Sequence, residues 1–308
     1  MENISTIRPS ARGLAGIAAA TLIAALAACW AIAAPVLAAP TGEFAPFAQC
    51  PLSTPKLSGC IFATTESGEV TIGKSTVPIT NPITLQGGFI ESRTSTEDTF
   101  VEAANGETLS RSPQPVPGGL AGLVKCDEIT GTEPTAAVER LFCETVFQNG
   151  LTGVTATTEL AAPASSIGLD EENLLEETGT ALELPVKVKL SNPLLGEECY
   201  IGTNANHITF NLTTGTTSPP SPNKPIKGKK GTLTDNEEGN ILTIIGNSLV
   251  DNSFSAPEAS GCGGPAAFLL DPVIDLKLGL PAAAGENTAI LDGTLKQAGK
   301  TAVEEHSS

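Results

Sequence analysis

One stretch of the chain matches the phosphate-binding loop pattern GxxxxGKS letter for letter. The match runs from Gly68 to Ser75. A working phosphate loop needs a helix that begins at its Lys-Ser end, because free backbone amides and the helix dipole must face the phosphates. Here residues 76–79 are TVPI, which is strand sequence. We therefore expect a β-hairpin that turns at residues 73–74, and no nucleotide site.

Acid–base chemistry has few candidates in this sequence. His207 is the only histidine in the body of the chain and could act as a general base, since His306 lies near the C-terminal end. A lone histidine at the start of a predicted strand is more often a hydrogen-bonded surface residue. No Gly-x-Ser-x-Gly elbow occurs, although paired acids from distant strands would leave no linear motif. We predict no catalytic, cofactor-binding or metal-binding residue, and the alternative is an extracellular hydrolase that uses carboxylates or His207.

The chain contains seven cysteines, and one of them, Cys29, belongs to the N-terminal apolar segment. The other six are Cys50, Cys60, Cys126, Cys143, Cys199 and Cys262. An even number without a CxxC pair is typical of structural disulfides rather than zinc or redox sites. Six cysteines allow fifteen connectivities, but short loops close at the lowest entropic cost, which favours neighbours. The expected pairs are Cys50–Cys60, Cys126–Cys143 and Cys199–Cys262.

Alternating apolar and polar residues indicate β-strands over most of the chain. The clearest runs lie at 151–161, 181–190 and 207–213. The only convincing helix outside the two ends is predicted within 126–150, where Pro134 suits a first helical residue and an Asn-Gly pair suits the end. Cys126 and Cys143 bracket this helix, so we expect their disulfide to tie it against the sheet.

These elements predict an all-β fold, mainly an antiparallel sandwich or barrel-like, with one or two short helices. Residues 241–254 are expected to supply a pair of strands, and the apolar run 266–280 could form a helix broken near Pro272. The predicted organisation is a signal peptide at 1–38, one β-rich domain at 39–295 and a flexible polar tail at 296–308.

The first 38 residues have the character of a secretory signal peptide. A basic start precedes a long uncharged run, and residues 36–38 (VLA) offer a small-x-Ala cleavage pattern. In one alternative, residues 26–29 (LAAC) form a lipoprotein box and Cys29 is acylated. In another, the apolar run spans a bilayer uncleaved, for which it is long enough. Cleavage is preferred because the residues after Cys29 stay apolar, and it predicts a secreted or cell-envelope protein with no membrane span.

Composition disfavours several classes of partner. The chain has 17 basic and 34 acidic residues, a formal net charge of −17, and nucleic acids and anionic membrane surfaces repel such a protein. Tyr200 is the only tyrosine. Carbohydrate-binding grooves usually depend on aromatic platforms, so a glycosidase is also disfavoured. The one basic stretch is the Pro- and Lys-rich segment 218–230, and the partner stays unknown.

Six segments of the sequence form one set. They are CPLSTP (50–55), KSTVPITNPITLQGG (74–88), CETVFQNGLTGVTATTELA (143–161), ELPVKVKLSNPLLGEECYIG (183–202), NLTTGTTSPP (211–220) and NTAILDGTL (287–295). Together they resemble a family of exported bacterial proteins of unknown function, over nearly all of the chain after the signal peptide. The resemblance implies one exported unit and transfers no activity, ligand or catalytic residue. We therefore expect an exported, non-catalytic protein, a structural or binding module of the cell envelope or the medium.

Overall fold

The computed structural model describes residues 39–92, 98–119 and 153–307 of the 308-residue chain. These residues belong to one compact unit, Leu37–Ser308. The predicted signal peptide at 1–38, with its lipoprotein-box cysteine, lies outside the described residues. The helix predicted within 126–150 and the disulfide Cys126–Cys143 also lie outside them, so they stay predictions.

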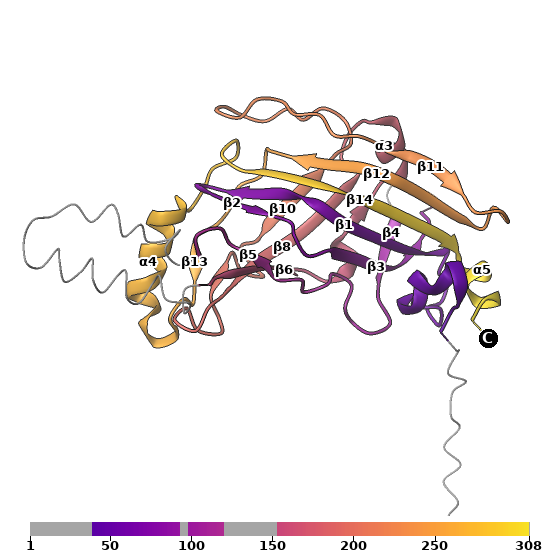
Figure 1. The fold of residues 1–308 in the computed structure, drawn as a ribbon, viewed down its shortest axis with the longest axis horizontal. Helices are drawn as coiled ribbons and strands as arrows, with labels where there is room; N and C mark the ends of the chain where they lie inside the picture. The colour runs from indigo at the N-terminus through magenta and orange to yellow at the C-terminus, as the bar shows by residue number, and fades with distance from the viewer. Residues whose placement is uncertain (1–38, 93–97, 120–152, 308) are drawn as a thin grey trace, which may run out of the picture. The chain divides into compact units, whose positions relative to one another are not determined.

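The described residues form a 14-stranded sheet in which every ladder is antiparallel (Figure 1). The strands are β1 (Gly59–Ile72), β2 (Ser75–Pro78), β3 (Ile83–Ile90), β4 (Asp98–Glu102), β5 (Gln114–Pro115), β6 (Thr155–Leu160), β7 (Gly168–Leu169), β8 (Leu182–Ser191), β9 (Tyr200–Ile201), β10 (Ile208–Leu212), β11 (Thr232–Asp235), β12 (Ile241–Asp251), β13 (Ala259–Ser260) and β14 (Thr288–Gly299). The short helices are η1 (Gly42–Gln49), η3 (Ala164–Ser166), α3 (Glu171–Glu176), η4 (Gly264–Ala266), α4 (Ala267–Leu278) and α5 (Lys300–Glu305). The predicted all-β, mainly antiparallel class is confirmed. Among the described residues, no helix combines the length and the apolar character needed to cross a bilayer.

The sheet is open but folds back on itself. Its strands follow the order β11-β12-β14-β1-β3-β4-β7-β8-β6-β5, while β2 pairs with β1, β9 and β10 pair with β8, and β13 pairs with β9. Thr213, after β10, and Val250 of β12 exchange two backbone hydrogen bonds of 3.0 and 2.9 Å. Side chains from β1, β12 and β14 therefore share one hydrophobic core with side chains from β6, β8 and β10. The result is a sandwich-like pair of layers.

The longest ladders join β1 and β12 to the two sides of β14. Both ladders shift register at the level of Gly293, where a Cβ atom would lie 1.9 Å from the carbonyl oxygen of Thr64. Only glycine permits this approach of the strands. Gly246, with a φ of 69°, supplies the extra residue of the bulge in β12. The predicted strand pair in 241–254 is therefore wrong, because this bulge bends a single strand without interrupting it.

A second, smaller hydrophobic cluster joins the two ends of the described chain. Val303 of α5 is fully buried in it, together with Phe44 and Phe47 of η1. The ring of His306 stacks on Phe44, with ring centroids 4.0 Å apart and an interplanar angle of 14°. The prediction of a flexible tail at 296–308 is therefore wrong, because β14 runs past its expected end and the valine of α5 completes the cluster.

Candidate functional site

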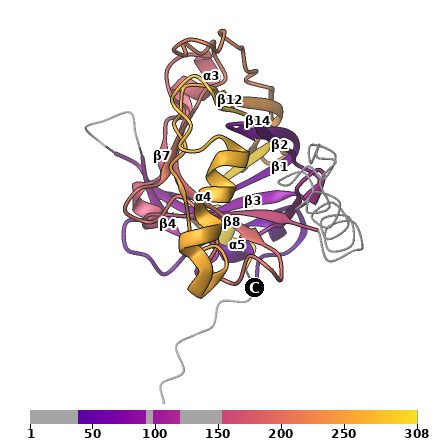
Figure 2. The same ribbon diagram turned by 90° about the vertical axis from the view of Figure 1, so that its left-hand side faces the viewer.

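Helix α4 lies across one end of the sheet, at the left of Figure 1 and towards the viewer in Figure 2. It follows the turn η4, in which Pro265 suits the start of a helix, and ends at Gly279, whose φ of 71° is the left-handed conformation of a helix C-cap. Pro272 lies inside α4 and removes one intrahelical hydrogen bond. The sequence predicts a break near this proline, but the helix continues through it, and its contacts with β13 explain why.

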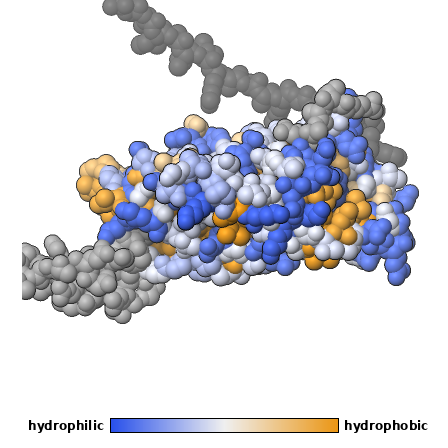
Figure 3. Space-filling view, turned by 90° about the horizontal axis from the view of Figure 1, so that it is seen from above, coloured by the Kyte–Doolittle hydropathy of each residue, from blue (hydrophilic) through white to orange (hydrophobic). Residues whose placement is uncertain are grey.

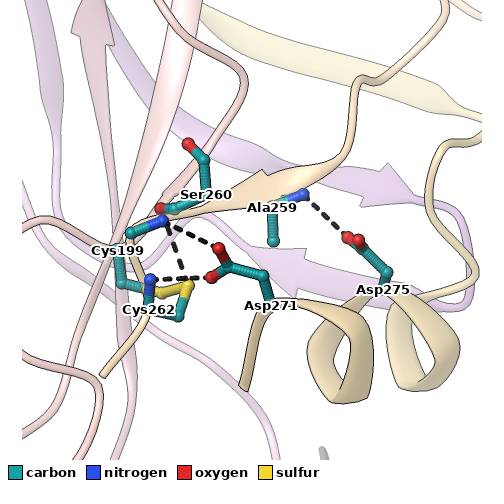
Figure 4. Close-up of a disulfide and its surroundings, with 7 residues drawn as sticks. Cys199, Ala259, Ser260, Cys262, Asp271 and Asp275 are labelled. Carbon is teal, nitrogen blue, oxygen red and sulfur yellow. Dashed lines mark hydrogen bonds between the residues drawn. A yellow bond between two sulfur atoms is a disulfide. The ribbon is translucent and has the colours of Figure 1, made fainter. Parts of the chain in front are cut away.

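Two aspartates attach α4 to the backbone of β13 and the turn after it (Figure 4). Asp271 accepts hydrogen bonds from the amides of Cys262 at 2.8 Å and Gly261 at 3.1 Å. One turn further along the same helix face, Asp275 accepts a hydrogen bond from the amide of Ala259 at 2.7 Å. Hydrogen bonds to ionised acceptors are among the stronger ones in proteins. Because the two carboxylates flank the proline, they hold the helix against β13 on both sides of it.

A buried disulfide fixes the same corner of the molecule. Cys199 and Cys262 are bonded and fully buried, and the Cys262 amide is also a donor to Asp271. Together with Cys50–Cys60, this bridge accounts for two of the three predicted pairs. Disulfides persist in oxidising compartments, so the two bridges indicate an extracytoplasmic environment.

The inward position of Asp275 has an electrostatic cost. Burial raises the pKa of Asp275; the hydrogen bond from the Ala259 amide opposes this rise, and the nearby carboxylates of Glu258 and Asp271 add to it. An ordinary surface helix directs its charges towards water. Helix α4 instead directs these two carboxylates towards the protein.

The solvent side of α4 is apolar, and we name its exposed side chains the outer face. They are Phe268 (75% exposed), Leu269 (60%), Val273 (45%) and Leu276 (74%). On the opposite side, Ile274 and Leu278 are buried. Apolar surface gathers over α4 at the left end of the view in Figure 3. A contiguous exposed apolar patch is typical of an interaction surface, whereas single exposed apolar residues are common and need no explanation.

The segment that matches the phosphate-loop pattern lies beside the C-terminal end of α4. It forms the hairpin β1–β2, as the strand sequence after it predicts. The Lys74 amide donates to the Leu278 carbonyl at 2.8 Å, and its Nζ donates to the Leu276 carbonyl at 3.5 Å. A cation at a helix C-terminus suits the helix dipole, whereas phosphate binding needs a helix N-terminus. This lysine therefore supports the end of α4.

His207 lies directly before β10 and contacts the backbone of the preceding turn. Its Nδ1 contacts the Asn204 carbonyl at 3.3 Å in the turn before β10. Within the described ranges, no carboxylate forms an ion pair with it, and no group of three or more His, Cys, Asp or Glu side chains is placed to hold a metal ion. The hydrolase alternative therefore gains no partner for His207 from this geometry.

Glu171 is a perturbed acid that the sequence does not single out. It lies at the start of α3, facing a hollow of about 50 Å³ lined mainly by leucines, and one of its carboxylate oxygens is buried without a hydrogen-bond partner in the described structure. Burial raises its pKa, the neighbouring Gln297 side chain partly offsets the rise, and Asp98 adds to it. The only sequence signal is an acidic run with room for one helical turn.

We expect Glu171→Gln to stabilise the protein above the raised pKa of Glu171. A raised pKa in the folded state means that stability is complete below the ordinary value of 4.5 and falls as the pH rises through the raised value. Glutamine cannot ionise and avoids that loss. Melting temperatures at pH 4 and pH 8 should show a gain at pH 8 only. Glu172→Gln, at the exposed neighbour, is the control, and an equal gain in both variants would contradict the prediction.

No protein-family model matches this chain, and neither does any curated protein sequence or solved structure. The functional assignment therefore depends on the residues and geometry of the chain itself.

Proposed function

We propose that this chain is an exported, non-catalytic binding module that contacts a partner protein through the outer face of α4. The observation that carries the proposal is the orientation of this helix, which places Asp271 and Asp275 against the protein and Phe268 and Leu276 in solvent. The two disulfides support a role outside the cytoplasm. Export by the signal peptide at 1–38, and the resemblance to exported bacterial proteins, belong to the same proposal.

Two properties of α4 and the net charge of the chain favour a protein partner. Its side chains project from one side of a single helix, which is how amphipathic helices engage apolar grooves. The disulfide and the two carboxylates already order α4, so binding loses little conformational entropy. The net charge of −17 disfavours an anionic lipid surface.

A binding role predicts that the outer face contributes little to folding. Changing Leu276 to serine should alter the free energy of unfolding by less than about 0.5 kcal/mol, as is usual for exposed positions. The matched change Ile274→Ser, two residues away on the buried side, should cost about 2–5 kcal/mol. Urea denaturation of both variants gives the comparison. An equal loss in both would show that Leu276 is part of the core.

The partner can be sought with a photo-crosslinking amino acid at position 276, in cells that export the protein. We expect an adduct with one protein species, its loss when Phe268→Ser is added, and no such adduct from the exposed position 301 of α5. An adduct with lipid or with a second copy of the chain would overturn the assignment to a partner protein, as would the absence of any adduct.

A further inference from the structure

Two adjacent cavities lie between the layers of the sheet. The first, of about 60 Å³, is bounded by β1, β2 and β3 on one side and by β5, β6 and β8 on the other. The second, of about 90 Å³, extends towards β10, β12 and β14. Val70, Ile83 and Thr158 line both, so the two cavities are neighbours, and we name the pair the interior cavity. An apolar cavity of about 150 Å³ in another protein binds benzene or xenon, and the second part alone, at about 90 Å³, is smaller than that but of the same order.

The lining of the interior cavity is chemically suited to hydrocarbon. Among the described residues, no charged side chain lines either part. The amide of Gln114 borders the first part, but its oxygen accepts from the amides of Thr80 at 2.8 Å and Asn81 at 2.9 Å, and its nitrogen donates to the Asn81 carbonyl at 2.7 Å. The other polar groups of the lining are the hydroxyls of Ser75, Thr64, Thr65, Thr158 and Thr294 and the amide of Asn247. All of them are uncharged, so the lining cannot neutralise a charged ligand.

Each wall of the cavity is a hydrogen-bonded layer of strands. β1 pairs with β2 and β3 on one side, and β6 pairs with β5 and β8 on the other. The side chains between these walls include short ones, such as Ala63, Val116, Val154 and Ala156, which leave space at the normal separation of packed sheets. These short side chains leave the space between two hydrogen-bonded layers.

Several residues that line the first part of the cavity are partly exposed to solvent. Val70, Val77, Ile83 and Val116 all line the first part, yet each is only half-buried. Val77 lies on the short strand β2, and Val116 directly follows the short strand β5. These partly exposed residues mark the side from which a small molecule would enter the first part of the cavity.

We propose that the interior cavity is a binding site for one small, uncharged hydrocarbon group, of the size of a benzene ring or a short alkyl chain. The site uses different side chains from the outer face of α4, so it does not depend on the proposed function. Its specificity comes from size and from the absence of charge in the lining, because any ionised group would be buried without a counter-charge.

Benzene is the probe that tests this site directly. Titration of methyl-labelled protein should give saturable NMR shifts for the methyl groups of Val70 and Ile83, which line both parts of the cavity. Benzoate, which has the same ring and a negative charge, should give none. Benzene should also raise the melting temperature, since it binds only the folded state. The absence of saturable shifts up to the solubility limit of benzene, or equal binding of benzoate, would overturn the proposal.

Substitutions that fill the cavity with larger side chains are the second test of benzene binding. Ala156→Leu places three extra carbons in the first part, and Ala63→Leu does so in the second. Each change should weaken benzene binding at least tenfold, and either one suffices if the other fails to fold. Ala104→Leu, at an exposed position, should leave the affinity unchanged. Unchanged affinity in a folded cavity variant would show that benzene binds elsewhere and would sink the proposal.

Discussion

Replacing Val303 with aspartate should lower the free energy of unfolding by about 3–5 kcal/mol, because it places an uncompensated charge inside the protein. Val303 is fully buried in the second hydrophobic cluster, between η1 and the end of β14. A typical domain is stable by only about 5–15 kcal/mol, so this loss is large. Urea denaturation followed by circular dichroism measures it.

The control for this prediction lies on the same helix. Thr301 is exposed in the first turn of α5, where an aspartate suits the helix dipole. Thr301→Asp should therefore leave the stability almost unchanged, although it adds the same charge. Equal stability of Val303→Asp and Thr301→Asp would mean that α5 does not pack on η1, and would restore the predicted flexible tail.

The strands could be predicted from the sequence, whereas the C-terminal helix could not. The alternating runs at 181–190 and 207–213 became β8 and β10, since one face of each strand is buried and a two-residue period results. Helix α5 buries only Val303 fully, with Ala302 partly buried beside it. Two adjacent apolar residues establish no helical period, so the packing of α5 depends on the distant residues of η1 and could not be predicted from the sequence.

The candidate site was predictable only in part. The apolar run 266–280 predicts a helix correctly, but not which side of it faces solvent. That side is decided by Asp271 and Asp275, whose partners are backbone amides around β13 rather than side chains with a recognisable pattern. The spacing of the two acids, one helical turn apart beside exposed apolar residues, is the only signal that could have indicated it. The interior cavity has no sequence signal, because its walls come from strands far apart in the chain.

Removing the Cys199–Cys262 disulfide should destabilise the protein by about 4 kcal/mol, and more than removing Cys50–Cys60. The first bridge spans 63 residues and the second spans 10. The entropy that a cross-link removes from the unfolded chain grows with the loop, to about 4 kcal/mol for the longer separation and just under 3 kcal/mol for the shorter. Paired changes of both cysteines to alanine avoid leaving a buried polar group, and urea denaturation gives the two losses.

Amide hydrogen exchange in α4 should distinguish Cys199–Cys262 from Cys50–Cys60 more sharply than the free energy of unfolding does. Cys262 joins the disulfide to Asp271, so without the bridge the turn after β13 loses its covalent tie to Cys199. Helix α4 also carries a proline, and a 12-residue helix is marginal in water without packing. Amide hydrogen exchange in α4 should therefore accelerate in Cys199→Ala/Cys262→Ala and stay unchanged in Cys50→Ala/Cys60→Ala. Equal protection of α4 in both variants would show that the two carboxylates alone hold the helix, and that its outer face does not need the disulfide to stay in place.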